Sequence, residues 1–159
     1  MSLNKIEIIN KLLETGTIDK TTLSKAISAC KEKKPITLKI LADYSGMTVS
    51  KIRLFFEEYF DLPIIDLDDI VPNPDLAKLV PMEISKIHCM IPAFKIVGKT
   101  HLAISNPFDE EGLKKINKYI GDNFGVFLAP EDQVIKALDN LYRRSQFVSV
   151  YDKTILHFT

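Results

Sequence analysis

The pattern of the chain changes near residue 61, and this change limits the folds that the sequence can adopt. Residues 1–60 contain one proline, and their apolar residues recur at helical spacing. Residues 61–159 contain seven prolines and short apolar runs bounded by turn residues. We therefore predict an α+β fold with a helical subdomain over residues 1–60, an α+β subdomain over 61–145, and a tail or linker over 146–159.

The first 60 residues predict helices whose boundaries are marked by capping residues. Gly16 would end the first helix, Asp19 would cap the second, Pro35 would begin the third, Gly46 would end it, and Thr48 would cap the fourth. The apolar spacing predicts these buried faces in turn: Ile6, Ile9 and Leu13; Leu23, Ala26, Ile27 and Cys30; Leu38, Leu41 and Ala42; Ile52, Phe55, Phe56 and Tyr59.

Residues 61–145 predict a three-stranded, partly antiparallel sheet covered by helices. Two apolar runs, 90–97 and 100–105, flank a turn at Gly98 and Lys99 and predict a hairpin, and residues 124–129 predict a third strand. We also expect a short strand over 63–67, helices that begin at Pro74, Pro81 and Pro130, and a helix after Asp109. Residues 147–159 alternate apolar and polar residues, which is typical of an edge strand or the start of a linker.

Composition excludes some broad classes of protein. Lys plus Arg and Asp plus Glu each number 21, so the net charge is zero, which argues against a dedicated nucleic-acid binder. No apolar run is long enough to span a bilayer, and no secretory signal is present, so we expect a cytoplasmic protein without direct membrane insertion. Cys30 and Cys89 lie far apart and suit small buried thiols in a reducing compartment.

The residues that support catalysis in other proteins are missing or isolated. The sequence has no GxxxxGK[ST] phosphate loop and no GxGxxG after a strand. The three histidines lack zinc-ligand spacing, and the acidic cluster Asp66, Asp68 and Asp69 is more typical of a solvated loop than of a cation site. We therefore predict no catalytic residue, no metal site and no bound cofactor in this chain.

The second half of the chain resembles a known family in several motifs at once. The segments FDLPIIDLDDIVPNPDLAKLVPMEISKIHCMIPAF (60–94), LAISNPFDEEGLKKI (102–116) and FLAPEDQVIKALDNLY (127–142) resemble the N-terminal domain of type II secretion and type IV pilus assembly ATPases. The order and near-family spacing of these motifs extend over residues 60–143. The resemblance implies a two-part N-terminal module that precedes an ATPase domain in cis in the full-length protein.

In related MshE-type N-domains, the helical half carries a motif for cyclic di-GMP, and a degenerate copy is present here. The first copy retains apolar and turn positions of that motif, namely Leu12, Leu13, Gly16, Ile18, Leu23 and Ile27. Its R-L-G positions hold Glu7, Ile8 and Ile9, and its Gln position holds Cys30. A second copy would keep Leu41 and Ala42, with Ser45 or Gly46 at its glycine. A dianionic nucleotide needs cationic or amide donors, and Glu7 offers a repulsive charge instead.

A second interpretation of the helical half is a helix-turn-helix. Ala42, Gly46 and Ile52 match its small, turn and apolar positions over residues 36–60, which would place Lys51 and Arg53 in a DNA groove. Residues 1–60 carry ten Lys or Arg against seven Asp or Glu, a balance of +3. The match rests on three residues, and any tight helical hairpin uses such residues for packing.

From these observations we expect a non-catalytic docking and regulatory module. By resemblance, its partner would be the cytoplasmic domain of an inner-membrane platform protein, which places the chain in the cytoplasm, peripheral to the inner membrane. The alternatives are a DNA-binding regulator and a cyclic di-GMP sensor with a degenerate motif.

The absence of a phosphate loop predicts that this chain does not bind ATP. The purified chain should give no heat of binding with Mg²⁺-ATP in calorimetry and no phosphate release, because no backbone cradle or Mg²⁺-binding Ser/Thr follows a strand. Stoichiometric, Mg²⁺-dependent ATP binding would contradict this prediction.

Overall fold

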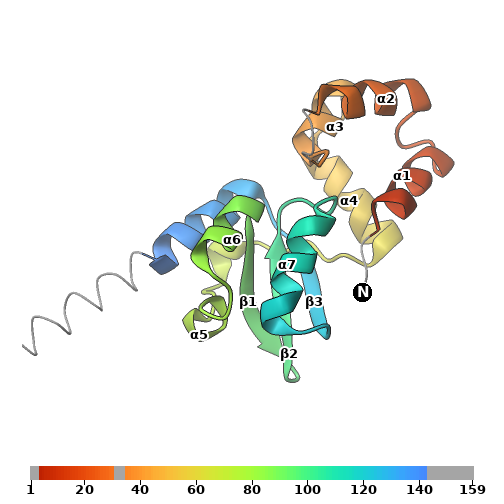
Figure 1. Cartoon of the computed structure of the whole chain (residues 1–159). Coiled ribbons are helices and arrows are strands. Elements are labelled where there is room, and N and C mark those ends of the chain that lie inside the picture. The colour runs from red at the N-terminus through yellow and green to blue at the C-terminus, as the bar shows by residue number, and fades with distance from the viewer. Residues whose placement is uncertain (1–3, 31–34, 143–159) are drawn as a thin grey trace, which may run out of the picture.

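The computed structural model describes residues 4–30 and 35–142, and these form an α+β fold, as predicted (Figure 1). The helical half contains α1 (Lys5–Glu14), α2 (Lys20–Ala29), α3 (Leu38–Ser45) and α4 (Val49–Phe60). The second half contains the 3₁₀ helix η1 (Leu67–Asp69), α5 (Pro74–Ala77), α6 (Met82–His88), β1 (Met90–Ile96), β2 (Lys99–Ile104), α7 (Glu110–Ile120) and β3 (Phe124–Leu128). A further helix, here called the closing helix, occupies residues 131–142. The predicted tail over 146–159 lies outside the described residues.

Local capping signals fix most boundaries in the helical half. The Asp19 carboxylate accepts a hydrogen bond from the Thr22 backbone N–H, and the Thr48 hydroxyl accepts one from Lys51, as predicted. Gly46 ends α3 in the left-handed conformation, at φ 74°. The predicted start of the third helix at Pro35 is wrong, because the Thr37 hydroxyl accepts a hydrogen bond from the Ile40 N–H and makes Thr37 the N-cap.

The buried face of α1 differs from the predicted one. Ile8 and Leu12 are fully buried, whereas Ile6 is 69% exposed and Leu13 is 37% exposed. Apolar residues occupy several adjacent rows of this helix, so spacing alone permits two faces. Packing selects the Ile8–Leu12 row, which joins the main core cluster.

The sheet has the strand order β1-β2-β3, with β1 antiparallel to β2 and β3 parallel to β2. This confirms the predicted three-stranded, partly antiparallel sheet. The predicted strand over 63–67 is wrong. Only Ile64 forms a bridge, to Leu128, and the chain turns into η1 at Leu67. Pro63 has no N–H to donate, which limits the pairing of this segment.

Both faces of the sheet are covered, and alternate residues of its strands divide between two clusters. Met90, Leu102 and Leu128 belong to the main cluster, which also contains Phe108 and Ile116 of the α7 region. Ile91 and Ala103 belong to a second cluster with residues of η1, α5 and the closing helix. The sheet is therefore the middle layer between two helical layers (Figure 1).

The turn of the hairpin lies one residue earlier than predicted. Ile96 pairs with Lys99, so Val97 and Gly98 form a two-residue turn. Both have positive φ, 50° for Val97 and 77° for Gly98, which is the backbone of a type I′ turn. That turn type matches the twist of the strands, but it normally has Gly, Asn or Asp at both central positions. Val97 is not one of these residues, so the sequence pattern placed the turn at Gly98 and Lys99 instead.

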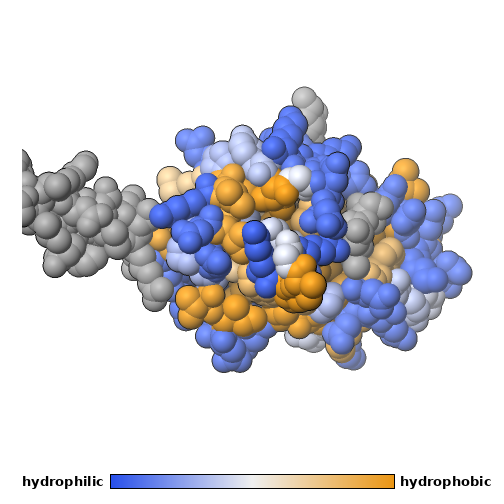
Figure 2. Space-filling view, turned by 90° about the horizontal axis from the view of Figure 1, so that it is seen from below, coloured by the Kyte–Doolittle hydropathy of each residue, from blue (hydrophilic) through white to orange (hydrophobic). Residues whose placement is uncertain are grey.

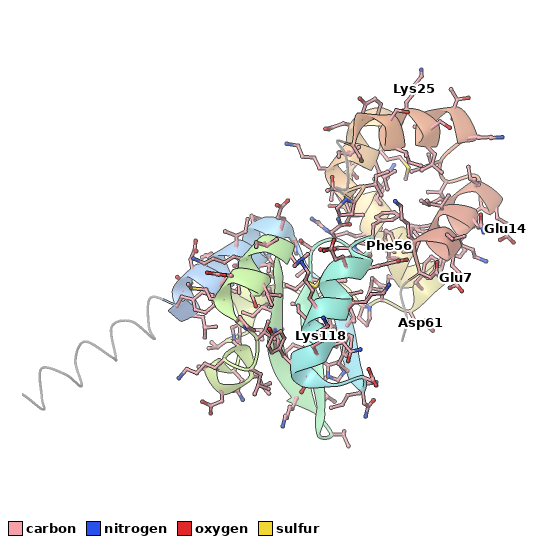
Figure 3. All side chains as sticks on the ribbon, in the orientation of Figure 1. Glu7, Glu14, Lys25, Phe56, Asp61 and Lys118 are labelled. Carbon is pink, nitrogen blue, oxygen red and sulfur yellow. The ribbon has the colours of Figure 1, made fainter. Side chains whose placement is uncertain are left out.

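The two halves share one core. The main cluster contains Ile8, Leu12, Leu41 and Ile52 from the helical half together with residues of the sheet. At its centre the fully buried Phe56 of α4 meets Phe108, edge to face, with ring centroids 5.8 Å apart. Figure 3 shows Phe56 where α4 of the helical half approaches α7.

Asp109 and Glu110, which follow Phe108, make polar contacts with helices of both halves. Asp109 caps α7 through the Gly112 N–H and lies 2.7 Å from Nδ1 of His88, at the end of α6. The Glu110 carboxylate accepts a hydrogen bond from the backbone N–H of Lys5, the first residue of α1. A Cβ on Gly112 would lie 2.7 Å from Oδ2 of Asp109 and 2.8 Å from the His88 ring, so this position requires glycine.

Replacement of Phe56 by alanine should destabilise both halves together. We expect a loss of about 3–5 kcal/mol, because a fully buried aromatic ring at the junction is removed. The measurement is urea unfolding followed by far-UV circular dichroism and by NMR signals from each half.

Tyr59→Ala is the matched control on the same helix. Tyr59 is 40% exposed, and we expect a loss of about 1 kcal/mol or less. Separate unfolding transitions of the two halves in the native chain would show that they do not depend on a common core.

Candidate functional site

The apolar positions of the predicted degenerate motif fall mainly in the core of the helical half. Leu12, Ile18 and Leu23 are at most 4% exposed and belong to the main cluster. Leu13 and Ile27 point outward, at 37% and 41% exposed. The structure therefore brings three of these side chains together and leaves two at the surface.

The polar positions of the predicted motif are less buried than its core positions. Glu7 is exposed on α1, and Figure 3 shows it with Glu14 on the outer side of that helix. Gly16 turns the chain between α1 and α2 with φ 72°. Cys30 is half-buried at the end of α2, with Sγ 3.5 Å from the carbonyl oxygen of Ala26. None of these groups supplies a positive charge to a phosphate.

The two residues of the DNA alternative do not share a face of α4. Lys51 is exposed, whereas Arg53 is half-buried, and two residues are separated by about 200° around a helix. Nε of Arg53 is buried without a hydrogen-bond partner among the described residues. Burial lowers the pKa of the Arg53 guanidinium, and the negative charge of Asp132 on the closing helix partly offsets this. Arg53 therefore faces the second half of the chain.

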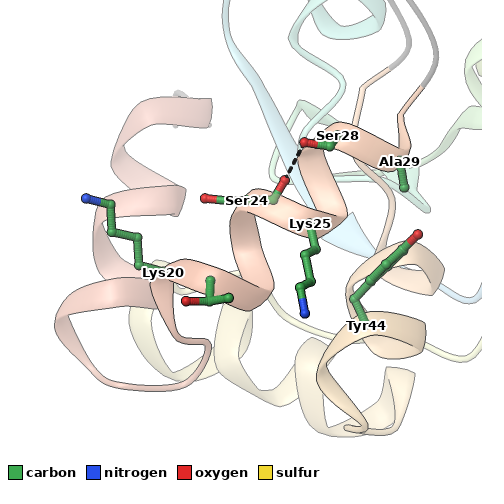
Figure 4. Close-up of a pocket in the computed structure, with 7 residues that line it drawn as sticks. Lys20, Ser24, Lys25, Ser28, Ala29 and Tyr44 are labelled. Carbon is green, nitrogen blue, oxygen red and sulfur yellow. Dashed lines mark hydrogen bonds between the residues drawn. The ribbon is translucent and has the colours of Figure 1, made fainter.

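A shallow depression, open to solvent, lies between α2 and α3 (Figure 4). It is lined by Lys20, Thr21, Ser24, Lys25, Ser28, Ala29 and Tyr44. The Ser28 hydroxyl donates to the Ser24 carbonyl oxygen at 2.9 Å, which leaves fewer donors for a ligand. Two ammonium groups and several hydroxyls suit a weakly held anion better than a deeply bound molecule.

A narrower groove of about 240 Å³ lies in the second half, between the 67–74 segment and the closing helix. Its lining is Leu67, Asp68, Ile70, Val71, Pro72, Pro74, Gln133, Lys136, Ala137, Asn140 and Leu141. The Leu67 N–H donates to Oε1 of Gln133 at 2.9 Å, and Lys136 lies 3.7 Å from Asp68. These contacts join the two walls of the groove. Val71, which is 76% exposed, adds apolar surface to it.

Neither the depression nor the groove is predicted by the sequence. The polar face of α2 follows from the spacing of Lys20, Ser24 and Ser28, which recur every four residues. The position of Tyr44 of α3 beside this face does not follow from the sequence. The groove joins segments more than sixty residues apart, such as Leu67 and Gln133, for which the sequence holds no local signal.

Within residues 4–30 and 35–142, no group of three or more His, Cys, Asp or Glu side chains could hold a metal ion. The described part of the chain also has no helix that is long and apolar enough to cross a membrane.

Comparison with known proteins gives matches in sequence and in fold. The model of the MshEN domain matches residues 60–147. The type IV pilus assembly ATPase PilB of Myxococcus xanthus (strain DK1622) is 26% identical over 93 residues, which are 58% of this chain. The chain spans only 16% of the length of that curated relative.

Among solved structures, that of MshE with cdg has a TM-score of 0.66 and 21% identity, and the match covers 84% of this chain and 96% of that one. The N-terminal domain of XpsE has a TM-score of 0.61 and 16% identity, with 87% and 95% covered. A second crystal form of that domain has a TM-score of 0.53, again at 16% identity. At these identities the likeness shows a shared fold.

The exposed Glu7 and the sulfur of Cys30 predict weak binding of cyclic di-GMP. We expect no dissociation constant tighter than roughly hundreds of micromolar, because each missing charge-assisted hydrogen bond costs about 1.5–3 kcal/mol. Calorimetry with the native chain and with Glu7→Arg tests this. A low-micromolar constant for the native chain would show that other donors replace the missing ones.

Proposed function

This chain belongs to the MshEN domain family, and we propose that it is the N-terminal docking and regulatory module of a secretion or pilus-assembly ATPase. The observation that carries the proposal is the family match over residues 60–147. The fold supports it, since the likeness to the XpsE N-terminal domain covers 95% of that domain. ATP hydrolysis would belong to a separate domain of the full-length protein.

The proposed task is to hold the motor on the cytoplasmic domain of an inner-membrane platform protein. Such a role needs a folded surface with apolar anchors and no chemistry of its own. Under this proposal the chain acts in the cytoplasm, at the inner face of the membrane.

The groove beside the closing helix is the surface that we assign to this contact. It lies within the family-matched part of the chain, whereas the α2–α3 depression lies outside it. Leu67, Ala137 and Leu141 supply apolar lining, and Asn140 supplies an amide that can fix the orientation of a partner.

The packing of α4 favours docking over DNA recognition. Ile52, Phe55 and Phe56 are buried in the shared core, and Arg53 faces the closing helix. Of the two predicted DNA-contact residues, Lys51 alone is exposed, and specific DNA binding uses several contacts to phosphates and bases.

Val71→Asp in the groove should weaken binding to the cytoplasmic domain of the platform protein from the same system by about tenfold or more. The reason is that a charge would replace an apolar contact at the interface. The measurement is calorimetry or biolayer interferometry with the two purified domains.

Ile6→Asp is the matched control, because Ile6 is 69% exposed on α1, outside the family-matched part. It should bind like the native chain. Failure of the native chain to bind the platform domain would refute the docking proposal, and equal losses in both variants would refute the assignment to the groove.

A further inference from the structure

The tip of the β1–β2 hairpin presents an apolar side chain entirely to solvent. Val97, the first residue of the turn, is 100% exposed, and its neighbour Ile96 is 45% exposed. Gly98 follows without a side chain, so the tip is convex and Val97 is its outermost group. No packing within the described residues accounts for a valine at this position.

The backbone of Val97 makes this choice of residue costly. Its φ of 50° is in the left-handed region, where a β-branched residue is an outlier. Asn, Asp or Gly would adopt this turn with less strain, and each is well suited to a solvent-exposed turn position. Strain of this kind, without a gain in packing, points to a function of the side chain.

The hairpin carries lysines and no carboxylates. Residues 90–104 contain Lys95 and Lys99 and no Asp or Glu, and the two lysines stand directly on either side of the Ile96–Gly98 tip. Asp122, in the turn before β3, also lies at this end of the sheet, and its carboxylate accepts a hydrogen bond from the Asn117 side chain at 2.6 Å. The tip therefore combines an apolar end with a basic collar.

The tip lies at one extremity of the molecule. It is the lowest point of the ribbon in Figure 1, and Figure 2, seen from below, shows apolar side chains among hydrophilic ones on this surface. The C-terminal end of α6, which carries Ile87, lies at the opposite end of the sheet, because His88 is two residues before the first residue of β1. A flat partner that approached from below in Figure 1 would meet the tip first.

We propose that this tip contacts an anionic phospholipid bilayer, with the Val97 side chain inserted among the headgroups and Lys95 and Lys99 beside the lipid phosphates. A convex apolar end between lysines suits the interface of such a bilayer, where apolar burial and attraction to anionic lipid add together. The contact is confined to one turn and is weak for a single chain. It goes beyond the docking function and does not depend on it.

The test is sedimentation of the purified chain with vesicles of equal parts phosphatidylglycerol and phosphatidylcholine, compared with vesicles of pure phosphatidylcholine. The native chain should bind the anionic vesicles preferentially, and added salt should reduce this binding. Val97→Asp should lower the partition coefficient roughly tenfold. Lys95→Gln and Lys99→Gln should lower it roughly fivefold each.

Val97→Asn separates loss of contact from loss of folding. Asn relieves the strain of the turn, so its melting temperature should rise by about 2–4 °C, while vesicle binding falls. Ile87→Asp is the matched control, since Ile87 is 76% exposed on α6, away from the tip. It should bind vesicles like the native chain.

Three results would overturn the proposal. These are equal binding of the native chain to both vesicle types, unchanged binding after Val97→Asp, and an equal loss in Ile87→Asp. If Val97→Asp instead abolished binding to the platform domain and left vesicle binding intact, the tip would be a protein contact and the bilayer proposal would be wrong.

Discussion

The contact between Phe56 and Phe108 is the constraint on which the arrangement of the two halves depends. Four short helices cannot bury an aromatic face as wide as that of α4 by themselves, so Phe56 reaches into the sheet half and completes its core. The neighbouring Asp109 and Glu110 then hold α6 and α1 by polar contacts. One short segment therefore positions three helices, and the composition boundary near residue 61 separates two kinds of structure that share one core.

The sequence predicted features that depend on neighbouring residues. Asp19, Thr48 and Gly46 act within one helical turn, so their caps could be inferred directly. The buried face of α1 could not be inferred in this way, because several rows of that helix are apolar. Only packing selects the row of Ile8 and Leu12. The hairpin turn was misplaced for a similar reason, since Val97 has no propensity for positive φ and only the pairing of Ile96 with Lys99 places it there.

The surfaces were less predictable than the fold. A groove such as that between Leu67 and Gln133 exists only after the closing helix packs beside η1, and neither segment alone indicates it. The burial of Arg53 was likewise hidden, because its neighbour Asp132 is far away in the sequence. The spacing of residues along the chain predicts helices. A binding surface depends on how helices that are distant in the sequence pack against one another, which this spacing does not contain.

The shared core also gives a physical reason why the predicted degenerate motif would keep its apolar positions without its polar ones. Leu12, Ile18 and Leu23 belong to the same cluster as Phe56, so truncation of any one of them would cost about 2–5 kcal/mol, a large part of the stability of a domain this size. Glu7 lies exposed on α1 and contributes no packing to that cluster, so a change there costs the fold little. Loss of a ligand would release the polar positions of such a motif, while the core would still require the apolar ones. The apolar positions alone are therefore explained by packing and do not indicate that a ligand binds.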